Sequence, residues 1–286
     1  MRLDVLGVRG STPAPGACFA GVGGNTSCVA LTATGRDRPT LVLDAGTGLA
    51  GVGPLLHGAA FVGTILLGHL HWDHTHGLPF FPAADRSDAR VRVLLPSQDE
   101  RAVDLIDRFM SPPSFPIGPT GLLGAWSFES IDEGRHVVDE FEVLAREVPH
   151  KGGRTFGFRV SDGDGTVTYV SDHGPLALGA GPDGWGEYHE AVLELSAGSD
   201  LLIHDAQFGP EELEVAARFG HSVGEYAVEL ARRAGVPRVL LHHHAPGRTD
   251  QQVGELEARL AAVPDVRVAA AREGVTIDLA TPGAAR

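Results

Sequence analysis

Short apolar runs alternate with amphipathic stretches along most of the chain. Each run is rich in β-branched or aliphatic residues and is bounded by Gly, Pro, Asp or Asn, which is typical of strands. The sequence predicts ten of them, at Leu3 to Gly7, Cys28 to Ala33, Thr40 to Asp44, Phe61 to Leu67, Val91 to Leu95, Phe141 to Val148, Thr155 to Val160, Val167 to Ser171, Leu201 to His204 and Arg238 to His242.

Helical periodicity interrupts these runs. Val103, Ile106 and Met110 share one face after Asp99 and Glu100, and a second apolar face repeats at three- and four-residue spacing from Val223 to Ala234. The turn residues Asp162 to Gly165 between two strand runs predict a hairpin. We therefore expect an α/β fold in which two sheets pack between outer helices.

The segment from Ser111 to Pro119 holds four prolines and cannot be regular structure, because proline removes a backbone donor and restricts its neighbour. Two interpretations remain open for residues 111–121: an ordinary connection, or a lid beside a functional site.

Composition favours a single domain over residues 1–286, since no Pro/Gly/Ser-rich linker or charge block divides the chain. The formal net charge of −14 disfavours binding to bulk nucleic acid, which usually requires a basic surface. Cys18 and Cys28 are too few for a disulfide framework and are interpreted as reduced packing residues. We expect a cytoplasmic protein without a membrane partner, because no signal-peptide pattern and no apolar segment of ~18 residues occurs.

The strongest chemical signal is His69-Leu70-His71-Trp72-Asp73-His74, which directly follows the apolar run ending at Leu67. Imidazole nitrogens and carboxylate oxygens suit divalent ions such as Zn²⁺, and alternate side chains of a loop can face different metals. These four ligands cannot fill two coordination spheres. Further candidates lie where other apolar runs end, at His150, Asp172 and one of the three consecutive histidines His242, His243 and His244.

At this point the chain resembles the metallo-β-lactamase superfamily, which implies a four-layer αββα sandwich. The segments Gly7 to Pro13, Gly23 to Ser27 and Leu43 to Gly48 resemble its phosphodiesterase branch, which contains ribonuclease Z and phosphoribosyl cyclic phosphodiesterase. Leu202 to Phe208 is similar to the His-Glu-Ala-Thr segment of ribonuclease Z, with Asp205 in the Glu position and Gln207 in the Thr position.

The resemblance implies two metals. His69, His71 and His150 would hold one, Asp73, His74 and His243 the other, and Asp172 would bridge them. Zn²⁺ is the expected ion, with Mn²⁺ and Fe²⁺ as alternatives. His243 is preferred because it fits the Leu-x-His-x-x-Pro pattern and because neighbouring side chains alternate along an extended segment. His76 and His173 are assigned roles outside the ligand set, and His57, His136 and His189 are interpreted as surface residues.

His221 and the metal-binding Asp73 are candidate catalytic residues. Ser222 and Glu225 match a capping box that would fix the helix start beside His221. By resemblance Asp205 would orient His221, and a carboxylate partner favours the protonated imidazole that a proton donor needs. Asp44 is interpreted as a helix cap, with a hydrogen bond into the ligand loop as the alternative. Lys151 and Arg154 are either phosphate-binding or part of a solvated loop.

The expected function is a dinuclear-metal hydrolase that cleaves a small cyclic or nucleotide-like phosphodiester through attack by a metal-bridging hydroxide. The partner would be that small molecule; a homodimer is left open. Alternatives are a lactone or thioester hydrolase, a tRNA 3′-processing endonuclease, or a non-catalytic metal-stabilised binding protein.

Overall fold

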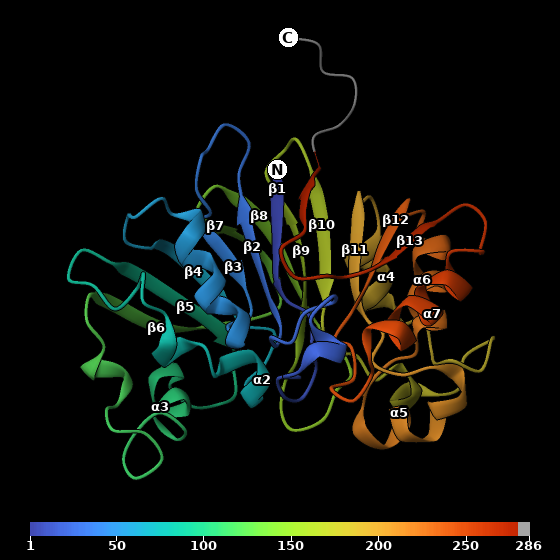
Figure 1. The fold of residues 1–286 in the computed structure, drawn as a ribbon, viewed down its shortest axis with the longest axis horizontal. Helices are drawn as coiled ribbons and strands as arrows, with labels where there is room; N and C mark the ends of the chain where they lie inside the picture. The colour runs from blue at the N-terminus through green and yellow to red at the C-terminus, as the bar shows by residue number, and fades with distance from the viewer. Residues whose placement is uncertain (280–286) are drawn as a thin grey trace.

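The computed structural model describes residues 1–279 and contains two seven-stranded sheets packed face to face (Figure 1). The strands of the first sheet, in spatial order, are β14 (Thr276–Asp278), β1 (Arg2–Gly7), β2 (Cys28–Thr32), β3 (Leu41–Leu43), β4 (Val62–Leu66), β5 (Arg90–Pro96) and β6 (Ala125–Ile131). Those of the second are β13 (Arg267–Ala270), β12 (Arg238–His242), β11 (Leu201–Asp205), β10 (Thr166–Val170), β9 (Phe156–Ser161), β8 (Phe141–Glu147) and β7 (Gly134–Val138).

Each sheet has a parallel half and an antiparallel half. Strands β3 to β6 are parallel in the first sheet, and β10 to β13 are parallel in the second. The remaining neighbours pair antiparallel. The turn of residues 162–165 joins β9 to β10, so the predicted hairpin is confirmed.

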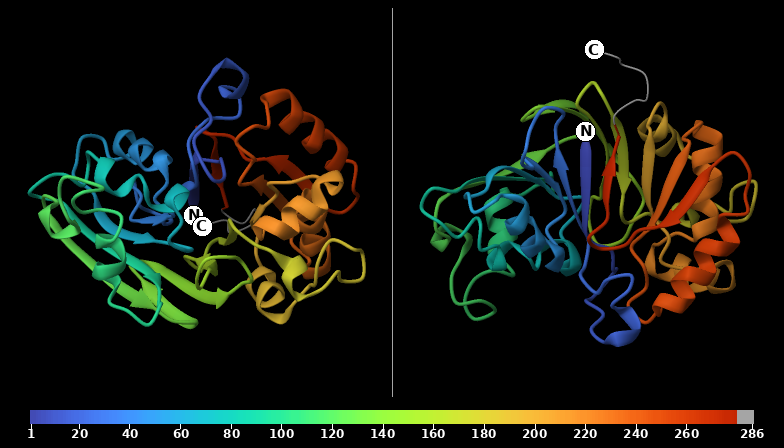
Figure 2. Two further views of the ribbon diagram at one scale, coloured as in Figure 1. Left: turned by 90° about the horizontal axis from the view of Figure 1, so that it is seen from below. Right: turned by 45° about the horizontal axis from the view of Figure 1, so that its top comes forward.

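Helices cover the outer face of each sheet, which gives the predicted four layers (Figure 2). The short helices α1 (Val52–Leu55) and α3 (Ala102–Asp107) pack on the first sheet. The second sheet carries α4 (Glu190–Ser196), α6 (Gly224–Ala234) and α7 (Asp250–Leu260). Helices α2 (Trp72–Thr75) and α5 (Leu213–Phe219) lie at the lower edge in Figure 1. No helix within residues 1–279 has the length and apolarity needed to cross a bilayer.

Burial on both faces explains why the inner strands are continuous apolar runs rather than alternating ones. In β2, Val29 and Leu31 join the core between the two sheets, whereas Cys28 and Ala30 join the core under the helices of the first sheet. Cys28 is thus a buried packing residue as expected, but the same interpretation was wrong for Cys18, which is exposed.

The segment of residues 111–121 contains only a single 3₁₀ turn, Pro119–Gly121, and lies beside α3. Phe115 within it contacts the ring of Phe80 edge-on at 5.7 Å between centroids. The absence of regular helix or strand around the prolines agrees with the sequence-based expectation.

Candidate metal centre

The candidate ligands meet at the seam between the two sheets, beyond the carboxyl ends of their strands. The segment after β4, which includes α2, supplies His69, His71, Asp73 and His74 from the first sheet. The second sheet supplies His150 after β8, Asp172 after β10 and His243 after β12. Parallel strands end at one edge, so residues far apart in sequence converge there.

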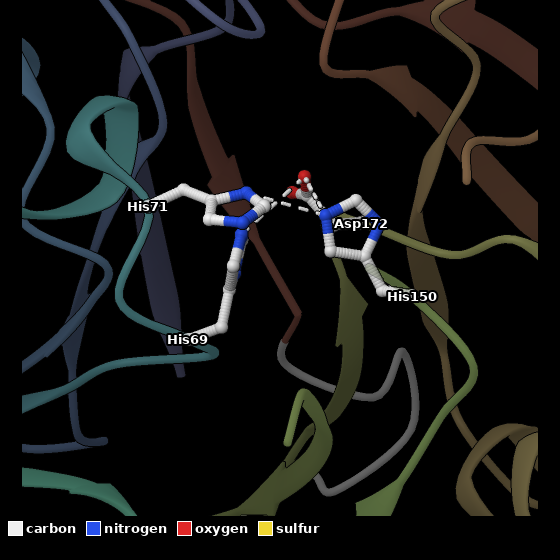
Figure 3. Close-up of side chains that lie close together, drawn as sticks. All are labelled: His69, His71, His150 and Asp172. Carbon is white, nitrogen blue, oxygen red and sulfur yellow. Dashed lines mark hydrogen bonds and ion pairs between the residues drawn. The ribbon is translucent and has the colours of Figure 1, made fainter. Parts of the chain in front are cut away.

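These seven residues form two groups that share Asp172: His69, His71, His150 and Asp172 in one, and Asp73, His74, Asp172 and His243 in the other. Within each group, one ligand atom per residue lies within 4.8 Å of all the others. The division is the one that the resemblance implied. Figure 3 shows His69 and His71 facing His150 across Asp172.

Distances around Asp172 show how closely its two oxygens approach the imidazoles. Oδ1 lies 3.0 Å from His74 Nε2 and 3.2 Å from His243 Nε2. Oδ2 lies 3.5 Å from His150 Nε2 and 3.7 Å from His69 Nε2. Each oxygen therefore faces a different group, as a carboxylate shared by two ions would require.

The site fits divalent ions because several of its polar atoms are buried without a hydrogen-bond partner among the described residues. These atoms include both ring nitrogens of His69. Unpaired buried polar atoms are costly unless something else satisfies them. The borderline N and O donors are those that zinc and similar ions prefer.

In the second group, the carboxylates and the imidazoles stabilise each other's charged forms. Burial alone would raise the pKa of Asp172, but His243, His74 and His69 hold it well below the ordinary range. Burial alone would lower the pKa of His243, yet Asp172 and the hydrogen bond to Asp73 raise it to about 9. Without metal, these carboxylates thus attract positive charge strongly.

Asp44 lies behind the second group and orients its histidine. Its Oδ2 accepts hydrogen bonds from His74 Nδ1 at 2.7 Å, from the Tyr169 hydroxyl at 2.8 Å and from the Ser171 hydroxyl at 3.1 Å. Its Oδ1 accepts one from the Gly68 amide at 2.7 Å. The proton on His74 Nδ1 leaves Nε2 free to face the ligand group. The capping interpretation of Asp44 is wrong, because the 3₁₀ turn that follows it has no side-chain cap, and the alternative of a hydrogen bond into the ligand loop is confirmed.

Of the three consecutive histidines, only His243 faces the ligands. His242 Nε2 lies 3.0 Å from the Gly7 carbonyl oxygen and His244 Nε2 3.1 Å from that of Ala271. Burial lowers the pKa of His242 to about 4 and that of His244 to about 3, so both are neutral at pH 7. Strand β12 ends at His242, and His243 has a left-handed backbone with φ 58°. Alternation along an extended segment is therefore not the reason for its direction.

The N-terminal segment from Gly7 to Pro13 contacts the second group of candidate ligands. The Ser11 amide donates to Asp73 Oδ2 at 2.6 Å, and Gln207 Nε2 donates to Ser11 Oγ at 3.1 Å. A Cβ on Gly10 would lie 2.5 Å from the His243 ring, so only glycine fits there. Buried Arg9 donates to the carbonyls of Gly23 at 2.7 Å and Arg248 at 2.6 Å, which anchors the loop after His243. The sequence marks this motif as a family feature but predicts no role for Ser11 or Arg9.

His221 and Asp205 lie together next to the ligands. His221 Nδ1 is 2.9 Å from Asp205 Oδ2 and 3.9 Å from Asp172 Oδ2. Asp205 is fixed in turn by the backbone amides of His173 at 3.1 Å and Gln207 at 3.0 Å. This arrangement leaves Nε2 of His221 available to a substrate.

The predicted capping box is wrong. Val223 is the N-cap of α6 and makes no side-chain cap hydrogen bond, while Glu225 lies 3.0 Å from Arg259. The Asp205 carboxylate and the Ala216 carbonyl, which accepts the His221 amide, hold His221 instead.

A glycine secures His150. Gly220 ends α5 with φ 80°, and its carbonyl accepts a hydrogen bond from His150 Nδ1 at 2.6 Å.

His173 is buried and contacts His204 and His189 at 3.0 and 2.9 Å between ring nitrogens. His189 is thus half-buried rather than a surface residue, and so is His136 on β7, whereas His57 and His76 are exposed.

Both metal groups open into a cavity of about 620 Å³. Its walls combine candidate ligands and His221 with mostly apolar residues: Ser11, Leu70, His71, Trp72, Asp73, His150, Asp172, Gln207, Phe208, Phe219, His221, Ala245 and Pro246. No residue of the 111–121 segment lines it, so the structure gives no support to the lid interpretation. Lys151 donates to the Arg218 carbonyl and Arg154 to Glu147 and Ser97, and neither lines the cavity.

The two-sheet sandwich with a histidine and carboxylate centre at its seam defines a metal-dependent hydrolase, as the sequence predicted. The chain matches the family described as "Beta-lactamase superfamily domain" over residues 40–244. Because the match spans more than half of the chain, the protein belongs to this superfamily, and the metallo-hydrolase resemblance is confirmed.

One relative and two solved structures are similar to this chain. The Ribonuclease Z of Geobacillus kaustophilus is 29% identical over 260 residues, which cover 77% of this chain and 82% of the relative. The metallo-β-lactamase fold protein YhfI from Bacillus subtilis has a TM-score of 0.70 at 18% identity, covering 97% of this chain and 99% of the other. A diphosphatase of the PhnP family has a TM-score of 0.66 at 16% identity, covering 97% of each chain. These two structures show the likeness of fold.

Proposed function

We propose that this protein is a phosphodiesterase with two divalent ions, most simply Zn²⁺, that acts on a small cyclic or nucleotide-like phosphodiester. The observation that carries the proposal is the cavity of about 620 Å³ in which both ligand groups and the Asp205–His221 pair meet. A volume of this size is typical of small-molecule sites. The fold and the ribonuclease Z relative point to phosphodiester chemistry.

His69, His71 and His150 would hold one ion, Asp73, His74 and His243 the other, and Asp172 would bridge them. When bound, such ions activate water near neutral pH and neutralise charge on the phosphoryl oxygens. The chain's own residues would fix this geometry: Asp44 orients His74, and the Ser11 amide orients Asp73. His221, held through Nδ1 by Asp205, would supply a proton from Nε2 to the leaving oxygen.

A tRNA 3′-processing endonuclease is the second candidate, because the relative named Ribonuclease Z shares 29% identity with this chain. Two observations favour the small substrate. No Lys or Arg lines the cavity, and the formal net charge of the chain is −14. A long polyanion binds mainly through basic side chains that contact its phosphates.

Hydrolysis of bis-p-nitrophenyl phosphate, measured with and without a chelator, tests the proposal. We expect chelator-sensitive turnover and close to two transition-metal ions per chain by elemental analysis after zinc supplementation. Metal near one equivalent would contradict the dinuclear centre, and metal-loaded protein without turnover would favour a non-catalytic binding protein. Cyclic nucleotides, cyclic ribose phosphates, lactones, thioesters and a tRNA precursor, assayed in parallel, would then rank the substrate classes.

A further inference from the structure

Two large aromatic side chains at the cavity are left open to solvent although the ligands beside them are buried. Trp72, the first residue of α2, is 66% exposed, and Phe219, the last residue of α5, is 49% exposed. Both line the cavity that contains His71, Asp172 and His221. Exposed aromatic surface next to buried polar groups commonly marks a ligand site.

Each ring is supported on one side by a neighbour on its own chain segment. Trp72 stacks on His76, with centroids 5.6 Å apart and an angle of 20° between the planes. The Arg218 guanidinium lies over the Phe219 ring, 4.6 Å from its centroid. These contacts restrain the rings, yet both retain large exposed areas that a flat ligand group could cover.

The charges around the rings favour an uncharged ligand group. No Lys or Arg lines the cavity. Lys151 donates to the Arg218 carbonyl, and the Arg218 guanidinium lies over the Phe219 ring. Arg108 and Arg154 line a separate hollow that also includes Trp72, and they pair there with Glu100 and Glu147. The two groups of metal-binding residues can attract a phosphate once metals are bound. The cavity wall formed by Trp72, Phe219 and Phe208 offers an apolar surface to the rest of the substrate.

We propose that Trp72 and Phe219 form an aromatic subsite for a flat, uncharged ring on the substrate, such as a nucleobase. The inference rests on the proposed phosphodiesterase function and deepens it, because it selects ring-bearing, nucleotide-like phosphodiesters over cyclic sugar phosphates without a base. Stacking of a base on an aromatic side chain is worth ~1–3 kcal/mol, which corresponds to roughly 5- to 150-fold in affinity.

Binding of two phosphonates to the zinc-loaded protein tests the subsite without turnover. Phenylphosphonate and methylphosphonate share the same anionic head and differ in the ring, so the ratio of their Kd values from calorimetry reports the ring contact. We expect phenylphosphonate to bind at least ~5-fold more tightly to the native protein. Trp72→Leu, which keeps an apolar side chain but removes the ring, should bring the ratio close to one, and Trp72→Phe should restore part of it.

Phe80→Ala is the matched control. Phe80 is also 66% exposed and follows the same ligand loop, but it does not line the cavity. Its removal should leave the ratio unchanged. Elemental analysis of each variant verifies that the metal content equals that of the native protein, since Trp72 lies between two candidate ligands.

An equal affinity of the native protein for both phosphonates would overturn the subsite, as would a ratio that Trp72→Leu and Phe219→Ala leave unaltered. The two proposals fail in different ways. A Trp72-dependent preference for the phenyl compound in a protein that hydrolyses no phosphodiester would keep the subsite and reject the phosphodiesterase. Hydrolysis of a phosphodiester by a protein with no preference for the phenyl compound would keep the phosphodiesterase and reject the subsite.

Discussion

Replacing Asp44 by Asn should weaken metal binding although Asp44 belongs to neither ligand group. Its carboxylate accepts four hydrogen bonds, three at Oδ2 and one at Oδ1. An asparagine of the same size must place its NH₂ group at one of the two positions. That group then faces either the Gly68 amide or the donors from His74, Tyr169 and Ser171, so at least one buried pair of donors is unavoidable.

The magnitude follows from these contacts. A buried donor without an acceptor costs ~1–3 kcal/mol, which should appear as a lower free energy of unfolding of the metal-free protein. Loss of the carboxylate that holds the proton on His74 Nδ1 typically weakens metal binding ~10- to 100-fold, or about 1.4–2.7 kcal/mol. The effect should concern the ion held by Asp73, His74 and His243 and spare the other ion.

Zinc titration against a chromophoric chelator measures the affinity of each site, and urea unfolding of the metal-free protein measures stability. Asp4→Asn is the control, because Asp4 is also buried and accepts from Arg2 at 3.3 Å and Thr276 at 2.6 Å, but lies outside the ligand groups. It should lose stability only. If Asp44→Asn loses stability like Asp4→Asn while both zinc affinities stay native, orientation of His74 by Asp44 is refuted.

Two further predictions concern the ligands and His221. Asp172→Ala should weaken the binding of both ions and abolish phosphodiesterase activity, whereas His243→Ala should release mainly one ion. Elemental analysis measures the metal content of each variant. Loss of metal in His242→Ala or His244→Ala, together with native metal content in His243→Ala, would contradict the choice of His243. His221→Ala should keep the metal content and lower kcat by ~10²–10⁴-fold on substrates with an alkyl leaving oxygen, and by less on bis-p-nitrophenyl phosphate, whose leaving group needs little protonation. Equal losses on the two substrates would indicate that His221 binds phosphate instead of donating a proton.

The strands that the sequence predicted and those it missed differ in where they lie. All ten predicted runs are strands inside a sheet, and their burial on both faces produces the continuous apolar runs. The four missed strands, β6, β7, β13 and β14, are the four edges of the two sheets. An edge strand has one neighbour and more exposed side chains, so it lacks a clear apolar run. In β6, only Ile131 is buried.

The candidate ligands could be found from sequence because each follows an apolar run directly, and the sheet edge then brings them together. Most of the supporting contacts could not: a hydrogen bond from Asp44 into the ligand loop was only the alternative to a helix cap, and the contact between Asp205 and His221 came from the resemblance rather than from spacing. Asp44 reaches His74 across 30 positions, and Ser11 reaches Asp73 across 62, so neither partner is marked by local spacing. The Ser222–Glu225 prediction failed for the opposite reason: a local pattern was present, but Arg259 from α7 pairs with Glu225.

The position of the centre links metal binding to folding. Four candidate ligands come from the first sheet and three from the second, so ions bound at both groups would join the two sheets across their seam. A ligand that binds only the folded chain stabilises it by RT ln(1 + [L]/Kd), which is about 2.7 kcal/mol at a free concentration of 100 Kd. The stabilisation by zinc, measured as the free energy of unfolding in zinc minus that in chelator, should therefore be smaller in each ligand variant than in the native protein. Asp172→Ala should also be less stable than the native chain in chelator, because His74 and His243, whose pKa values the Asp172 carboxylate raises, lose their buried anionic partner.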